Sequence, residues 1–69
     1  MIVLASVTGS DSHHELVRDD DGDLAFHTYL RDRDLDRPAT GAEAGEFWET
    51  ARRSGGYAKP GAGDGRERS

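Results

Sequence analysis

The absence of cysteine most constrains how this chain can fold, because the chain has only 69 residues. A domain of this size buries roughly 60% of the surface that its unfolded chain exposes, and its core supplies about 3–5 kcal/mol of net stability. Small domains commonly add disulfides or a thiolate zinc site, and neither can form here. We therefore expect one small core that a partner completes, either a second copy of the chain or another protein.

The charge of the chain restricts the kind of partner. Fourteen acidic and nine basic residues give a formal net charge of −5. Negative charge opposes binding to nucleic acid, which requires a cationic surface, and it opposes adhesion to anionic membranes. It suits a basic or polar protein, and it also favours solubility. The composition thus predicts a protein partner or a homo-oligomer, with no nucleic acid and no membrane.

The apolar start of the chain does not have the features of a membrane or export segment. Residues 2–7 are mostly apolar, but they lack a positively charged flank and are too short for the hydrophobic region of a signal peptide. No segment reaches the roughly 18 apolar residues that span a bilayer. We expect a cytoplasmic protein, and the lack of cysteine agrees with that location.

Three segments have the composition of β-strands. Ile2–Val7 is a nearly continuous apolar run followed by turn-forming residues, which indicates a strand covered on both faces. His13–Arg18 and Leu24–Leu30 flank an Asp-Gly pair, which predicts a hairpin. The segment 31–38 alternates in charge, and it either extends the third strand or forms a loop that ends at Pro38.

A helix is the best-supported element of the chain. Thr40 followed three residues later by Glu43 forms the pattern of a capping box, and Gly55 can end the helix. We expect the helix to run from Gly41 to about Arg53. Its apolar residues recur at helical spacing and form one stripe: Ala44, Phe47, Trp48 and Ala51.

These elements predict an α+β fold in which one C-terminal helix packs on a small antiparallel three-stranded sheet, in the order β-β-β-α. The domain is expected to cover residues 1–55. Residues 56–69 are rich in Gly and charge and are expected to form a disordered tail. The expected core consists of Val3, Ala5, Leu16, Leu24, Phe26, Leu30, Phe47, Trp48 and Ala51.

Two groups of residues have some of the features of a metal site. The acidic run 19–23 resembles part of a calcium loop, but placing Gly22 at position 6 puts Val17 and Thr28 at positions that need acidic ligands. His14 and His27 could approach each other across the hairpin, with a nearby carboxylate as a third ligand. Half-exposed histidines without a metal are the simpler interpretation, and we expect no cofactor.

Several hydroxyl groups lie close in sequence to the histidines, but no motif of nucleophilic catalysis surrounds them. The sequence therefore favours a non-enzymatic accessory or regulatory protein that acts by binding another protein. The side chains predicted to make that contact are Ile2, Leu4, Phe47 and Trp48. One alternative is a small enzyme or metal-binding protein that uses His14 and His27, and another is an acidic mimic of nucleic acid.

Overall fold

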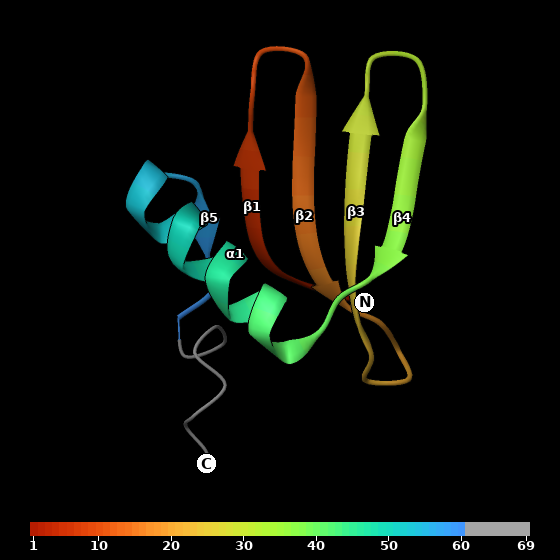
Figure 1. The fold of residues 1–69 in the computed structure, drawn as a ribbon, viewed down its shortest axis with the longest axis vertical. Helices are drawn as coiled ribbons and strands as arrows, with labels where there is room; N and C mark the ends of the chain where they lie inside the picture. Colours follow the sequence, from red (N-terminus) through yellow and green to blue (C-terminus); the bar gives the residue numbers. More distant parts are fainter. Residues whose placement is uncertain (61–69) are drawn as a thin grey trace.

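Five antiparallel strands form a single sheet, and one helix packs on it (Figure 1). The computed structural model describes residues 1–60. Its elements are β1 (Ile2–Thr8), β2 (Ser12–Arg18), β3 (Leu24–Leu30), β4 (Asp34–Pro38), α1 (Gly41–Ser54) and β5 (Tyr57–Ala58). The strands lie in the order β4-β3-β2-β1-β5. Within residues 1–60, no helix has the length and apolar character that crossing a membrane requires.

The prediction of an antiparallel sheet with one helix is confirmed, but the predicted number of three strands is wrong. The charged segment forms β4, because a tight turn after β3 reverses the chain and the Leu30 amide donates to the Arg33 carbonyl at 2.8 Å. Every residue of β4 is exposed. Alternating charge and Pro38 make this strand a poor template for further strand pairing.

The second additional strand follows the helix. Tyr57 and Ala58 pair with Ser6 and Ala5 of β1, and the Lys59 amide donates to the Leu4 carbonyl at 2.8 Å. The Trp48 indole N–H donates to the Lys59 carbonyl at 3.0 Å. The folded part therefore extends beyond its predicted end at residue 55. The predicted disorder of residues 61–69 lies outside the described residues.

The helix begins and ends almost as predicted. The Thr40 hydroxyl accepts from the Glu43 amide at 3.1 Å, and the Glu43 carboxylate accepts from the Thr40 amide at 3.0 Å. Gly55 ends the helix with a φ of 84°, a conformation that glycine adopts without strain. The Gly56 amide then donates to the Ala51 carbonyl, which turns the chain back toward β1.

We expect the capping box to make stability depend on pH. The pKa of the Glu43 carboxyl is held below its ordinary value of 4.5. The largest cause is the hydrogen bond from the Thr40 amide, and the next is the Arg37 guanidinium at 3.5 Å. A lowered pKa in the folded state means that ionised Glu43 stabilises the fold above pH 4.5 and that this contribution is lost as the pH falls further. Glu43→Gln should therefore lower the urea midpoint at pH 7, and the difference from the unmodified protein should shrink as the pH falls below 4.5. Glu46→Gln, which removes an exposed charge from the same helix, is the control, and a difference that stays constant with pH would contradict this role.

The core lies between α1 and the strands beside it, because α1 contacts β1, β2 and β5. A shift in the pairing of β1 with β2 inserts one extra residue between Val3 and Ala5. Such a bulge lets two consecutive residues belong to one buried layer. The buried cluster accordingly contains both Leu4 and Ala5, together with Leu16, Ala44 and Ala51. The partly buried side chains around it are Val7, Leu24, Phe26, Ala39, Phe47 and Trp48.

Candidate functional site

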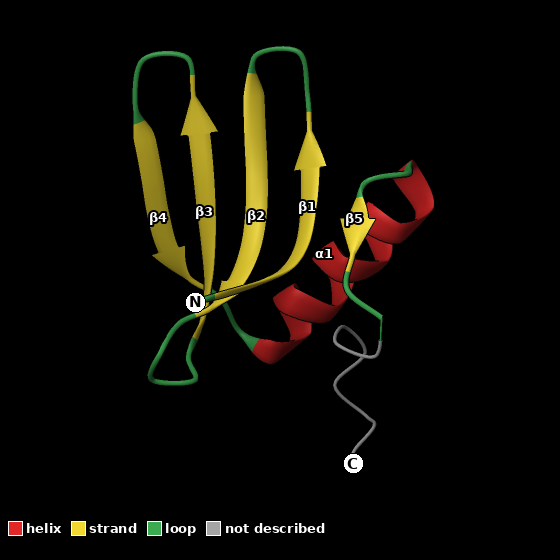
Figure 2. Ribbon diagram, turned by 180° about the vertical axis from the view of Figure 1, so that it is seen from behind, coloured by secondary structure: helices red, strands yellow, loops and turns green. Residues whose placement is uncertain are grey.

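The two faces of the sheet differ because α1 covers only one of them. Leu16 and Phe26 pair across β2 and β3 and point to the helix side, where the Phe26 ring contacts the Phe47 ring at 5.3 Å between centroids. Successive residues of a strand point to opposite faces. Figure 2 shows β1–β4 from behind, where no helix covers them. We call this side the helix-free face, and the residues it carries include Ser6, Thr8, His13, Glu15, His27, Tyr29, Asp34 and Asp36.

A chain of hydrogen bonds begins on this face at the end of β1. The Thr8 hydroxyl lies 2.7 Å from Nδ1 of His13, and Nε2 of His13 lies 3.0 Å from the Glu15 carboxylate. Both nitrogens of the imidazole are therefore engaged, which fixes the orientation of the ring. The Glu15 side chain is 19% exposed, so its carboxylate is held among its neighbours and is not freely solvated.

The same chain continues across β3 to β4. The Tyr29 hydroxyl donates to Glu15 at 3.5 Å and lies 3.5 Å from Nδ1 of His27. Nε2 of His27 lies 3.8 Å from the Asp36 carboxylate. Three rings form a row, since the centroid of Tyr29 lies 5.9 Å from that of His13 and 6.3 Å from that of His27.

Negative charge is concentrated around the middle ring of this row. Desolvation raises the pKa of the Tyr29 phenol above its ordinary value of 10.0, and the nearby charges of Glu15, Asp34 and Asp36 raise it further. These carboxylates come from two different strands, β2 and β4, so their negative electrostatic potential extends across the strands on both sides of β3.

The structure does not bring together the two histidines of the predicted metal site. His14 pairs with Thr28, whereas His27 pairs with Glu15 in the next row, so the two imidazoles point to opposite faces. On the helix side, the His14 ring lies 3.1 Å from the Ser12 hydroxyl and 3.4 Å from the Thr28 hydroxyl. The expected approach of His14 and His27 required a hairpin that closes on the Asp21-Gly22 pair. The loop instead holds five residues, 19–23, and this shifts the pairing of β2 with β3 by one residue.

The acidic run forms the turn between β2 and β3, as the hairpin predicted from its Asp-Gly pair requires. Asp19 accepts hydrogen bonds at 2.9 Å from the amides of Asp21 and Asp23, and Gly22 has a φ of 87°. Carboxylates of Asp19, Asp21 and Asp23 lie within 4.8 Å of one another, and all three residues are exposed. The carboxylate of Asp19 therefore shapes the loop.

Most of the side chains predicted to contact a partner pack within the molecule instead. Leu4 is 5% exposed and belongs to the core, and Phe47 and Trp48 pack against that core. Ile2 alone of the four remains largely exposed, at 51%. The predicted contact surface is therefore reduced to the beginning of β1.

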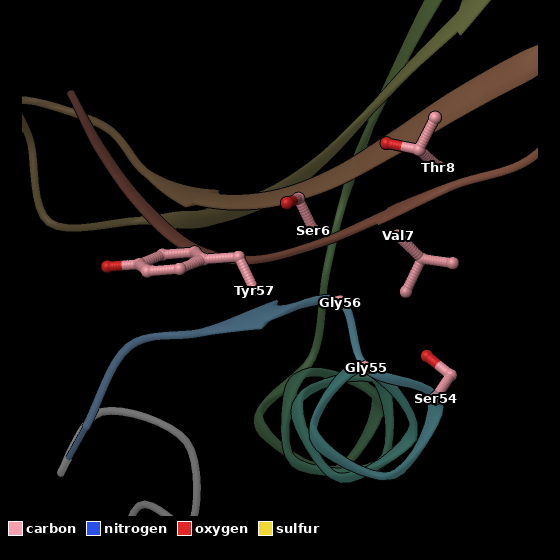
Figure 3. A pocket seen from close by; sticks show the side chains of 7 residues that line it. All are labelled: Ser6, Val7, Thr8, Ser54, Gly55, Gly56 and Tyr57. Atoms are coloured by element: carbon pink, nitrogen blue, oxygen red, sulfur yellow. The ribbon is translucent and has the colours of Figure 1, made fainter.

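A hollow of about 330 Å³ lies beside the free part of β1. It is lined by Ser6, Val7, Thr8, Ser54, Gly55, Gly56 and Tyr57. Figure 3 shows that Val7 points from β1 toward α1, whereas Ser6 and Thr8 point to the other side. The hollow therefore lies between β1 and the end of α1, next to the Thr8 end of the hydrogen-bonded chain.

The order of groups at this end is that of nucleophilic catalysis, in which a hydroxyl, an imidazole and a carboxylate stand in line. Such a site also needs a cavity that excludes water and holds the substrate. His13 is 34% exposed on an open sheet face. The arrangement therefore offers hydrogen-bonding groups at an open surface of the sheet.

Comparison with models of protein families, with curated proteins and with solved structures finds no match to this chain. Functional inference therefore depends on the chemistry of the site alone. Sequence reasoning considered Glu15 only as a third metal ligand and did not group it with His13 and Tyr29, although alternation along the strands could have done so. His13 and Glu15 are two residues apart in one strand, and so are His27 and Tyr29 in the next.

Proposed function

We propose that this protein is a small non-enzymatic accessory or regulatory protein, and that it binds another protein through the helix-free face. The observation that supports this most directly is the row of His13, Tyr29 and His27 with Glu15 held between them. These side chains are only partly exposed, yet no other element of residues 1–60 covers them.

The chemistry of this row suits a protein interface. Tyrosine and other rings with a polar edge provide apolar contact area together with hydrogen bonds, and they lose little side-chain entropy on binding. The hydrogen bonds among Thr8, His13 and Glu15 hold the side chains in place before a partner arrives. Such preorganisation lowers the entropic cost of association.

The small core supports the same proposal. The buried cluster holds two leucines and three alanines, with no large aromatic side chain fully buried. A domain with so little apolar burial gains stability when a partner binds the folded state. A cytoplasmic location, where disulfides are not maintained, is part of this proposal.

Capture experiments with variants of the face test the proposed function. We expect the immobilised protein to capture a partner, or a second copy of itself, from an extract of its own cells. Tyr29→Ala and His27→Ala should each reduce that capture at least about fivefold, because the central residues of an interface contribute most of its binding energy. Glu46→Ala, on the outer side of α1, is the matched control and should leave capture unchanged.

Circular dichroism of each variant shows whether it has folded, so that lost capture can be assigned to the face. Equal capture by the unmodified protein and by a folded Tyr29→Ala variant would overturn the assignment of the face. A protein that stays monomeric at all concentrations in sedimentation, and that captures nothing, would overturn the proposed function itself.

A further inference from the structure

We propose that the partner presents an arginine-rich segment, and that this segment lies across the helix-free face with its guanidinium groups on the row of rings and on the flanking carboxylates. This inference rests on the proposed function and adds the chemical class of the partner. It is carried by the distribution of charge between the two faces of the sheet.

The strands β1–β4 separate their charged side chains by sign. The carboxylates of these strands, Glu15, Asp34 and Asp36, all lie on the helix-free face near Tyr29. The guanidinium groups of the same strands, Arg18 and Arg37, belong to the rows that face the helix side. The helix-free face of β1–β4 thus carries three carboxylates and no arginine or lysine.

Contacts within the molecule keep the two arginines on their own side. The Arg37 guanidinium lies 4.8 Å from the centre of the Phe26 ring and 3.5 Å from the Glu43 carboxylate. Arg18 donates to the Gly22 carbonyl at 2.8 Å. Neither cation is directed toward Asp34 or Asp36 on the opposite face, where the His27 imidazole lies 3.8 Å from the Asp36 carboxylate. Both aspartates are exposed, so their carboxylates can accept a cation from another molecule.

Arginine fits this face better than lysine does. Its planar guanidinium stacks on aromatic rings and donates two parallel hydrogen bonds to a carboxylate. The rings of His13, Tyr29 and His27 provide the stacking surface, and Glu15 and Asp36 lie at its two sides. An extended segment that follows β3 would place successive arginines over Tyr29 and His27, between the carboxylates of β2 and β4.

Binding of a fluorescein-labelled peptide of eight arginines, measured by fluorescence anisotropy at 50 mM salt, tests the partner class. Asp34→Asn/Asp36→Asn should weaken binding about fivefold or more, since two charge contacts are removed. Asp21→Asn/Asp23→Asn removes the same charge from the turn between β2 and β3, and it should weaken binding less than twofold. Tyr29→Ala should weaken binding as well, and a peptide of eight lysines should bind more weakly than the arginine peptide.

The outcomes separate this inference from the proposed function. Equal loss in the two double variants would mean that the peptide responds only to net charge, and it would overturn the inference. The protein could also fail to bind the peptide and still capture a partner, with Tyr29→Ala abolishing that capture. This result would overturn the inference and leave the proposed function in place. If Tyr29→Ala changes neither peptide binding nor capture, both proposals fail.

Discussion

Replacing Trp48 by alanine should lower the free energy of unfolding by about 3 kcal/mol, which is most of what a core of this size supplies. Trp48 packs against the buried cluster, and its indole N–H donates to the Lys59 carbonyl at 3.0 Å. The variant loses apolar contact and leaves that carbonyl without its donor. Because the same bond holds the chain after β5 against α1, we expect β5 to separate from β1 at the same time. Chemical denaturation followed by circular dichroism measures the loss.

Trp48→Phe is the matched control, because phenylalanine keeps an aromatic ring in the core but cannot donate to Lys59. We expect it to cost about 1 kcal/mol, the value of one hydrogen bond, plus a small packing loss. A Trp48→Ala variant as stable as the unmodified protein would show that this side chain contributes nothing to the core. Equal losses in the two variants would show that the hydrogen bond outweighs the packing.

Elements that depend on local chemistry were predicted well from the sequence. The capping box of Thr40 and Glu43, the end of the helix at Gly55 and the turn at Gly22 all occur at the predicted residues. Each of these depends on groups within a few positions along the chain, such as a side-chain oxygen that reaches a nearby amide or a glycine that takes a positive φ. The pattern of a short segment contains that information.

Features that depend on distant pairing were predicted poorly. The nearly continuous apolar run of β1 indicated a strand covered on both faces, whereas its bulge places Leu4 and Ala5 in the same buried cluster on the helix side. β5 has only two residues and forms because β1 offers an open edge beside the end of α1. Its sequence, Tyr57–Ala58, has no strand pattern of its own, so only the assembled fold specifies it.

The grouping of side chains at the candidate site was predicted wrongly from the sequence for a related reason. Pairing His14 with His27 assumed one hairpin register, and a shift of one residue moves a side chain to the other face. The observed register pairs Glu15 with His27 and His13 with Tyr29, which assembles the helix-free face. The residue types were visible in the sequence, but their grouping depends on the length of the loop.

Gly56→Ala should detach β5 from the sheet, and we expect it to lower the free energy of unfolding by about 1–3 kcal/mol. A Cβ atom added at Gly56 would overlap the Ser6 carbonyl oxygen, and it would also lie 3.4 Å from the Ser6 carbonyl carbon and 3.5 Å from the Ala51 carbonyl oxygen. These are backbone atoms, which cannot move aside as the end of a flexible side chain can. The chain after the helix must therefore shift, and it loses the bond between the Lys59 amide and the Leu4 carbonyl. Hydrogen exchange of the Lys59 amide measures this loss directly.

Gly41→Ala is the matched control, because an added Cβ at Gly41 meets nothing within 4 Å and alanine favours a helix. It should leave stability unchanged or raise it slightly. In Gly56→Ala, amide hydrogen exchange at Lys59 should become faster, whereas exchange at Leu16 and Phe26 in the paired central strands should stay slow. That result would show that β5 separates as a unit. Slow exchange at Lys59 in that variant would mean that the approach of Gly56 to Ser6 does not determine the position of β5. Since β5 also carries Tyr57 beside Ser6 and the hollow of about 330 Å³, the same variant should alter the Thr8 end of the helix-free face and leave the row at Tyr29 in place.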